Sequence, residues 1–285
     1  MDYHPEFSVE RMCKVLRVSR SGYYDFQRRK PSARLIENKK ITEQIKRVYK
    51  ESKNRYGSPK ITHSLVSDGW KVSGQRVARI MRYNGIRSIV SKKFRVSTTD
   101  SSHKYPIAEN HLNRNFTARR PAEKWVSDIT YIHTEQGWLY LTIIMDLFDR
   151  KIIGWAQSTE MTAEATVLAA WRMAVLNRPI KQLLTFHSDR GVQFASHAFR
   201  DELKRHPVLQ SMSRKGNCWD NAVTESYFKI LKSEMVNHRK YISILQAKKE
   251  VFEFIEIWYN RQRKHSYLGY KTPEEYSKIN YSKCA

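Results

Sequence analysis

The chain has 285 residues, of which 40% are hydrophobic, and a formal net charge of +24 from 52 Lys and Arg against 28 Asp and Glu. This apolar content is enough for a packed core and excludes a disordered basic tail. Such a positive excess costs free energy through self-repulsion, and a polyanionic partner explains it best, although ribosomal proteins share high charge. Residues 1–120 carry 28 basic and 10 acidic side chains, and residues 121–285 carry 24 and 18. We therefore expect residues 1–120 to make most of the contacts with nucleic acid.

The cysteines and the N-terminus indicate the compartment. Cys13, Cys218 and Cys284 are far apart and form no C-x-x-C pair, so neither a disulfide framework nor a Cys-rich zinc site is predicted. No stretch approaches the roughly 20 apolar residues of a membrane span. The N-terminal residues lack the apolar core of a signal peptide. We expect a cytoplasmic protein without a membrane partner.

The first part of the chain predicts helices. Residues 7–26 indicate two short helices separated by a Ser-Arg-Ser-Gly turn, and residues 36–52 follow a helical period. The apolar positions on one face of that period are Ile41, Ile45 and Val48. Ser58 and Pro59 predict the N-cap and first residue of the next helix.

Residues 71–87 predict a further helix, which Ser73 caps after a turn at Asp68-Gly69. Its buried side is expected to hold Val77, Ile80 and Met81. Three arginines remain free and are candidate DNA contacts: Arg76, Arg79 and Arg82. A helix, a turn and an Arg-bearing second helix make the helix-turn-helix plan, in which the second helix enters the major groove. A three-helix bundle with a solvated basic face is the alternative, and the basic excess favours DNA binding.

Residues 88–120 are polar, basic and weakly periodic, which predicts an exposed linker that follows phosphates. After Pro121 the pattern changes to strands, expected at 124–132, 137–148, 150–158, 182–189 and 207–213. Helices are expected at 162–177, 196–206, 217–235 and 244–263. The first three strands form an antiparallel meander, and the following alternation of helices and strands predicts a mixed α/β sheet with helices on its faces.

Three acidic residues of this part are candidates for one site. Asp128 lies inside the first strand, where an aspartate is unfavourable unless something recruits it. Asp189 closes the fourth strand, and Glu225 lies on the helix after the fifth. Clustered carboxylates raise one another's pKa, and two Mg²⁺ or Mn²⁺ ions, which prefer oxygen ligands, would remove the repulsion. Such ions, about 3.5–4 Å apart, activate an attacking hydroxyl and stabilise the leaving oxygen of a phosphodiester.

Periodicity alone does not select these three from the 28 acidic residues. A hydrogen-bonded core Asp128, a turn-forming Asp189 and a surface Glu225 are the alternative interpretations. The stretches WVSDITYI, HSDRGVQFAS and SRKGNCWDNAVTESYFKILKSE, however, resemble the three catalytic blocks of DDE transposases and retroviral-type integrases. Thirty-five residues separate Asp189 from Glu225, which is the spacing of that superfamily.

The resemblance is closer to the OrfB-type transposases of bacterial insertion sequences. The stretches YGSPKIT, VSGQRVARIMRYNGIR and YNRQRKHSYLGYKTPEEY resemble their helix-turn-helix region and C-terminal block, so the likeness covers most of the chain. It implies an RNase H-like fold with Asp128, Asp189 and Glu225 as catalytic ligands of two Mg²⁺ or Mn²⁺ ions. The implied reaction is cleavage at the element's ends by an activated water, followed by attack of the freed 3′ hydroxyl on another phosphodiester.

Further partners and residues follow from this resemblance. It implies terminal repeats and target DNA as substrates, an upstream-frame OrfA protein or frameshift fusion as partner, and a dimer or larger assembly near the bacterial nucleoid. Lys232 matches a basic position after the family's glutamate and is expected to hold phosphate; a solvated helix lysine is the alternative. Arg263 and Lys264, in the C-terminal block, are further candidate DNA contacts. The implied domains are an N-terminal helical segment (1–36), the helix-turn-helix (37–98), a basic linker (99–120), the RNase H-like core (121–238), and a C-terminal helix with a basic tail (239–285).

Several other residues have two interpretations. His187 should point to the same side as Asp189 by strand alternation, either tuning the site or packing in the strand. Trp219 and Tyr227 are candidates for stacking on an unpaired base or for core packing. Asp149, with Asp146, is expected to serve a turn, and Asp220, with Asn221, to cap the helix of Glu225. Two rival functions stay open: a nuclease that cuts without joining, and a repressor that has lost the chemistry.

Overall fold

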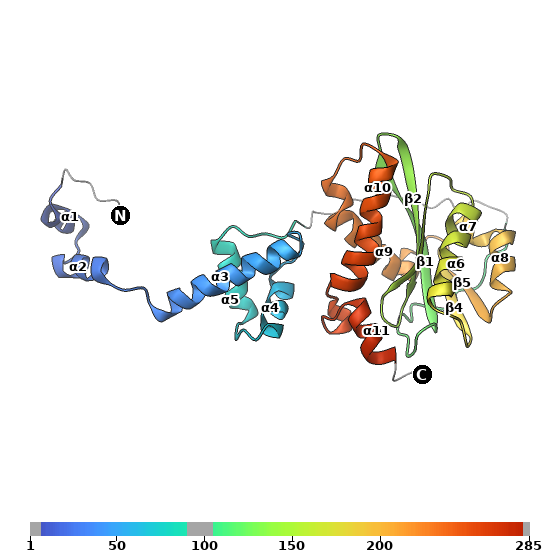
Figure 1. The fold of residues 1–285 in the computed structure, drawn as a ribbon, viewed down its shortest axis with the longest axis horizontal. Helices are drawn as coiled ribbons and strands as arrows, with labels where there is room; N and C mark the ends of the chain where they lie inside the picture. The colour runs from blue at the N-terminus through green and yellow to red at the C-terminus, as the bar shows by residue number, and fades with distance from the viewer. Residues whose placement is uncertain (1–6, 90–104, 282–285) are drawn as a thin grey trace. The chain divides into compact units, whose positions relative to one another are not determined.

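The computed structural model describes residues 7–89 and 105–281. The chain divides into two compact units, a helical unit (Met1–Ser88) and a sheet unit (Ile89–Ala285) (Figure 1). Within the two described ranges, no helix has both the length and the apolar character needed to cross a membrane.

The helical unit contains α1 (Val9–Leu16), α2 (Arg20–Arg28), α3 (Ala33–Glu51), α4 (Ser58–Ser67) and α5 (Gly74–Tyr83). Ser73 caps α5 as predicted, because its hydroxyl accepts a hydrogen bond from the backbone N of Arg76 at 3.2 Å. The predicted cap of α4 is wrong by one residue, since Gly57 is the N-cap and Ser58 is already helical. Helix α3 begins at Ala33 and so crosses the predicted boundary between residues 36 and 37.

Helices α3, α4 and α5 pack around one small core. Its buried side chains are Ile41, Ile45, Val48, Ile61, Leu65, Val77, Ile80 and Met81. This burial confirms the predicted apolar faces of α3 and α5. The α4–α5 connection turns at Gly69, whose φ of +87° would strain any side chain. The pair is therefore arranged as the predicted helix-turn-helix.

The described residues of the sheet unit form one five-stranded sheet in the order β3-β2-β1-β4-β5. The strands are β1 (Lys124–Thr134), β2 (Gly137–Asp146), β3 (Ile152–Ser158), β4 (Leu184–Ser188) and β5 (Val208–Met212). β1, β2 and β3 pair antiparallel, whereas β4 is parallel to both β1 and β5. This topology confirms the predicted RNase H-like mixed sheet.

The helical segments of this unit are η1 (Glu164–Leu168), α6 (Ala169–Asn177), α7 (Val192–Ala195), α8 (His197–Leu203), η2 (Cys218–Asn221), α9 (Ala222–Glu234), η3 (Val236–His238), α10 (Ile244–Phe252), η4 (Glu253–Gln262), η5 (Ser266–Leu268) and α11 (Pro273–Tyr281). The predicted helix at 162–177 is a π-helical turn, η1, followed by α6, and the helix at 244–263 is α10 followed by π-helical η4. Helix α11 was not predicted and takes up much of the expected basic tail.

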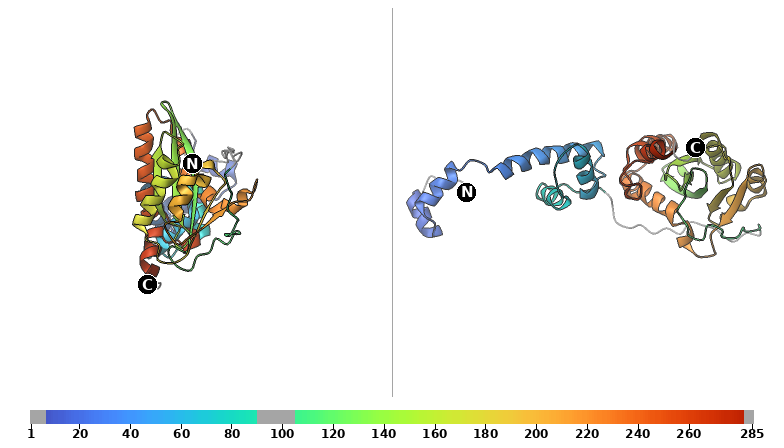
Figure 2. Two further views of the ribbon diagram at one scale, coloured as in Figure 1. Left: turned by 90° about the vertical axis from the view of Figure 1, so that its right-hand side faces the viewer. Right: turned by 90° about the horizontal axis from the view of Figure 1, so that it is seen from below.

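The two faces of the sheet carry different helices. α6, α7 and α8 cover one face, and α9 and α10 cover the other (Figures 1 and 2). The first face is filled by an aromatic cluster in which Trp171 meets Trp125 and Phe186 edge-to-face, at centroid distances of 5.5 and 5.4 Å. A Cβ at Gly154 on β3 would lie 2.3 Å from the carbonyl oxygen of Ala170, so only glycine allows α6 to approach this closely.

Part of the predicted linker packs on the sheet unit. Residues 90–104 lie outside the described residues, but Leu112 is buried and its backbone N donates to Ser211 Oγ at 3.1 Å. Asn110 Nδ2 donates to Asp220 Oδ2 at 2.8 Å. Residues near Leu112 are therefore structural parts of the sheet unit and do not form an exposed linker.

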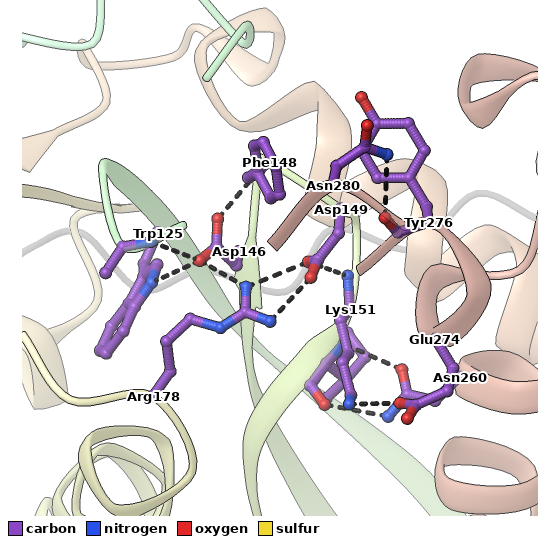
Figure 3. A network of polar contacts seen from close by, with 12 residues as sticks. Trp125, Asp146, Phe148, Asp149, Lys151, Arg178, Asn260, Glu274, Tyr276 and Asn280 are labelled. Carbon is purple, nitrogen blue, oxygen red and sulfur yellow. Dashed lines mark hydrogen bonds and ion pairs between the residues drawn. The ribbon is translucent and has the colours of Figure 1, made fainter. Parts of the chain in front are cut away.

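A buried ionic network fixes the turn between β2 and β3 to the end of α6 (Figure 3). Arg178 donates to Asp146 and Asp149 at 2.7 Å each, and neither carboxylate is exposed. Asp146 Oδ2 also accepts from Trp125 Nε1 at 3.1 Å, and Asp149 Oδ1 accepts from the backbone N of Lys151 at 3.1 Å. Turn chemistry at Asp149 is confirmed, but the shared arginine was not predicted.

Replacing Arg178 with methionine should destabilise the sheet unit strongly, because two unexposed carboxylates would lose their counter-charge. We expect the free energy of unfolding to fall by about 3–5 kcal/mol. Urea unfolding of the full chain, followed by tryptophan emission, measures this, since six of the seven tryptophans lie after residue 88.

Arg172→Met is the matched control, because the Arg172 guanidinium pairs with Glu164 on the exposed surface. This variant should change the free energy of unfolding by no more than about 1 kcal/mol. Equal losses in both variants would contradict the structural role of the network.

Candidate active site

The pairing of β1 with β4 brings Asp128 and Asp189 to the same place. The parallel register runs through Lys124–Thr185 and Trp125–Phe186 to Val126–His187. Asp128 and Asp189 each follow this last pair by two residues. Because parallel strands advance in step, both carboxylates lie where the two chains stop pairing.

Glu225 comes from α9, whose first turn is fixed against β1. The hydroxyl of the preceding Thr224 donates to the carbonyl of Asn221 at 2.9 Å and lies 3.4 Å from Asp128 Oδ2. Asn221 Nδ2 donates to the carbonyl of Ser127 at 3.2 Å. The backbone of Glu225 is therefore one residue from a direct contact with Asp128, and its own side chain is exposed.

The electrostatics show that the charges of Asp189 and Glu225 act on Asp128. Burial raises the pKa of Asp128 well above its ordinary value, and the charges of Asp189 and Glu225 raise it further. The backbone N–H of Ile129 opposes this by donating to Asp128 Oδ1 at 2.8 Å. Desolvation by its neighbours also raises the pKa of Glu225, although the side chain is largely exposed.

Hard divalent cations prefer oxygen ligands, and their positive charge relieves the repulsion among neighbouring carboxylates. In the part of the chain that the structure describes, no three His, Cys, Asp or Glu side chains are close enough to hold one ion together. The backbone positions of Asp128 and Asp189 are fixed by strand pairing, and that of Glu225 by the Thr224 contact. To bind one ion together, these three side chains would have to rotate, and the exposed Glu225 has room to do so.

Lys232 lies further along α9 and within the field of the same site. Its Nζ is 5.4 Å from the ring centroid of Tyr131 on β1. Burial lowers the pKa of Lys232, and the negative charge of Asp128 opposes that shift. This lysine is half-buried, unlike a fully solvated helix lysine, and its contact with DNA stays a prediction.

His187 is a buried strand residue. Its Nδ1 lies 2.8 Å from Ser211 Oγ and its Nε2 lies 3.2 Å from Ser213 Oγ. Burial lowers its pKa to about 4, so the ring is neutral near pH 7. The packed interpretation therefore describes its contacts, and a tuning role beside Asp189 stays a prediction.

Two of the arginines proposed as DNA contacts form ion pairs within the protein. Arg263 is 8% exposed, and its Nη2 donates to the buried Glu234 at 2.9 Å. Arg76 donates to Asn38 Oδ1 at 2.8 Å and to Glu37 Oε2 at 2.8 Å. The prediction that Arg76 is free is wrong, and the DNA contacts of Arg76 and Arg263 stay predictions. Each forms a hydrogen-bonded ion pair with an acidic side chain of another segment.

The remaining candidates are distributed differently. Arg79 and Arg82 are exposed on α5, and Lys264 is half-buried, so their DNA contacts stay predictions. Trp219 is 68% exposed, whereas Tyr227 is 1% exposed. Tyr227 packs edge-to-face on Tyr259 at a centroid distance of 4.7 Å, so it is a core residue.

Asn221 is the N-cap residue of α9 as expected, although its side chain makes no capping hydrogen bond, whereas Asp220 lies in η2 and does not cap the helix. No side chain caps the start of α9, and Asp220 instead accepts hydrogen bonds from Arg114 and Arg214. Sequence reasoning missed this cluster because Arg114 lies 106 positions away along the chain.

Comparisons with known proteins agree with this geometry. Residues 118–218 match the family model described as "Integrase core domain", residues 206–273 match a second model of that description, and residues 36–94 match "HTH-like domain". Transposase InsF for insertion sequence IS3A of Escherichia coli K12 is 39% identical over 280 residues, which cover 98% of this chain and 96% of the relative. The chain belongs to the InsF-type transposases of IS3 insertion sequences.

A second relative is the uncharacterized 31 kDa protein of insertion element IS600 from Shigella sonnei, 38% identical over 262 residues that cover 92% of this chain and 96% of the relative. Among solved structures, the HTLV-2 integrase catalytic core domain in complex with magnesium is 17% identical, with 55% of this chain and 97% of that chain covered and a TM-score of 0.42. The integrase core model and the InsF relative show that the transposase is a polynucleotidyl transferase of the DDE superfamily, which acts in DNA transposition and integration.

Replacing Arg263 with glutamine separates a structural from a DNA-binding role. The variant should lower the free energy of unfolding by about 3–5 kcal/mol, because Glu234 would stay buried without its counter-charge. At a temperature where the variant is folded, the slope of log affinity for a DNA duplex against log salt should equal that of the wild type. A slope that becomes shallower by about one would instead indicate a lost phosphate contact.

Proposed function

We propose that Asp128, Asp189 and Glu225 bind two Mg²⁺ or Mn²⁺ ions and that the transposase thereby cuts DNA at the ends of its insertion sequence and joins the freed 3′ hydroxyls to target DNA. This proposal is supported by the adjacency of the backbone positions that bear the three carboxylates. Asp128 and Asp189 follow one parallel strand pair, and Thr224 contacts Asp128 from the turn that holds Glu225. When bound, such ions activate the attacking oxygen and stabilise the leaving one.

Hydrogen bonds within this chain restrict the proposed metal ligands, and a lysine is available to bind the DNA. Asp189 Oδ1 accepts a hydrogen bond from the backbone N of Gly191 at 2.9 Å, which limits the rotation of that carboxylate. Asp128 is limited in the same way by Ile129 and Thr224. Lys232, on the same helix as Glu225, would neutralise a phosphate of the bound strand. No protein nucleophile is required, because water and then the DNA 3′ hydroxyl attack.

The partners follow from this reaction. The substrates would be the terminal inverted repeats of the element and a target duplex. Two ends must be held at once, so we infer a dimer or larger assembly of this chain. An OrfA protein of the upstream frame, separate or fused by frameshifting, would add DNA recognition, and the complex would act at the bacterial nucleoid.

Asp128→Asn should abolish Mg²⁺-dependent cleavage and joining while leaving DNA binding intact, because the substitution removes a ligand charge and preserves the side-chain shape. The assay uses a labelled duplex that carries the element's own end, and strand-transfer products distinguish this function from that of a nuclease that only cuts. Asp201→Asn is the control, since Asp201 is an exposed partner of Lys204. Undiminished cutting by the Asp128 variant would refute the metal assignment.

Arg79→Ala combined with Arg82→Ala should weaken duplex binding and make its salt dependence shallower, by about one unit of log-log slope for each lost phosphate contact. Fluorescence anisotropy titrations across a salt series measure both quantities. Arg47→Ala is the matched control, because Arg47 is paired with Glu51 and Asp68. If the double variant keeps the wild-type slope, the helix-turn-helix arginines do not contact phosphate.

A further inference from the structure

Asp220 is a fully buried carboxylate at the entrance to α9. Its Oδ1 accepts from Arg114 Nε at 3.0 Å and from Arg214 Nη2 at 2.8 Å. Its Oδ2 accepts from Arg214 Nε at 2.9 Å, from the Arg214 backbone N at 3.0 Å and from Asn110 Nδ2 at 2.8 Å. One carboxylate thus binds two arginines that are far apart along the chain: Arg114 precedes β1, and Arg214 follows β5.

The contact with Asp220 leaves part of each guanidinium group exposed to solvent. The side chains of Arg114 and Arg214 are 47% and 49% exposed, although the carboxylate between them has no exposure. Arg114 Nη2 also donates to Asn217 Oδ1 at 3.0 Å. Each arginine therefore has one edge fixed by the protein and another edge in solvent.

The arginine pair is connected to the active site through short links. Ser213, which precedes Arg214, donates its backbone N to the carbonyl of Ser188 at 3.0 Å, and Asp189 is the next residue. On the other side, Asp220 lies in η2, which continues directly into α9 and so to Glu225. The pair is therefore fixed to the elements that carry two of the three active-site carboxylates.

Burying a carboxylate to hold two arginines half in solvent gives little to the core but fixes both cations in position. A guanidinium that is already fixed loses less rotamer freedom when it binds a phosphate, and its planar fork suits phosphate oxygens. Two cations against one anion leave a net positive charge, which suits a singly charged phosphodiester. The fully hydrogen-bonded Asp220 faces the arginines, which shield it from an approaching anion.

We propose that Arg114 and Arg214, held by Asp220, form a binding site for a DNA backbone phosphate beside the bond that the transposase cuts. Arg114 and Arg214 contact the phosphate, and Asp220 is a positioning residue that acts through them. This site rests on the proposed function for its substrate, since it names where the cleaved strand is held.

The test compares single methylphosphonate substitutions, which remove one phosphate charge each, near the cleavage site of a duplex carrying the element's own end. Binding is measured by anisotropy without divalent ions in the Asp128→Asn protein, so that no cutting occurs. At one or two positions the neutral linkage should weaken binding about three- to tenfold. With Arg114→Gln or Arg214→Gln added, the all-phosphate duplex should bind more weakly by a similar factor, and the penalty at those positions should disappear.

Arg172→Gln, which removes an exposed arginine paired with Glu164, should leave the whole pattern of penalties unchanged. Asp220→Asn should reduce the penalties at the same positions, because both arginines lose their anchor. If Asp220→Asn fails to fold, Arg214→Lys replaces it, which keeps the charge but loses the fork, and should reduce the penalty only in part. Wild-type penalties at every position in both arginine-to-glutamine variants would overturn the proposal and leave Asp220 as a structural clamp.

These binding measurements, together with the cleavage assay on the wild-type protein with Mg²⁺, separate this proposal from the proposed function. If the wild-type protein does not cut the duplex with Mg²⁺ but the position-specific coupling is found, the phosphate site stands and the catalytic assignment fails. If the protein cuts and no coupling is found, the catalytic assignment stands and the phosphate site fails.

Discussion

The parallel contact between β1 and β4 is the constraint on which the proposed active site depends. It is short, yet its register decides where Asp128 and Asp189 lie. A slip by one residue would turn every side chain of β4 to the opposite face. Such a slip is opposed by packing, because Trp125 and Phe186 belong to the aromatic cluster under α6. The apolar core on one face of the sheet thus positions the carboxylates at the end of the pairing.

Two carboxylates of the sheet unit, Asp220 and Asp128, differ in how their charge is compensated. Hydrogen bonds from Arg214 hold the pKa of Asp220 far below its ordinary value, and Glu234 is similarly bound by Arg263. These groups are compensated by protein cations and fix chain segments together. The pKa of Asp128 is raised instead, because burial and neighbouring negative charge outweigh its hydrogen bonds. Charge compensation is therefore incomplete at Asp128, where the proposed function places a metal ion.

The sequence was sufficient for most of the elements but not for the ion pairs, and the role of the acidic trio stays a prediction. Strand alternation and helical period are local properties, so the five strands and the apolar face of α5 could be predicted. The trio was selected by its resemblance to the DDE motif, since no local property distinguishes Asp128 from other strand aspartates. Arg76 and Arg263 looked like free cations, and their partners lie 39 and 29 positions away. Whether an arginine forms an ion pair within the protein depends on tertiary contacts, which a local sequence pattern does not contain.

The structure also changes how the positive charge is apportioned. Divided at residue 120, the excess lies mainly in the first part of the chain. Divided at the observed boundary, residues 1–88 carry 21 basic and 8 acidic side chains, and residues 89–285 carry 31 and 20. Internal ion pairs leave these differences unchanged, because each pair removes one charge of either sign. The sheet unit therefore carries an excess of 11 against 13 for the helical unit, so attraction to a polyanion is shared almost equally between them. A catalytic unit that had only to perform chemistry on DNA held elsewhere would not need such an excess, and its size argues that this unit binds the substrate itself.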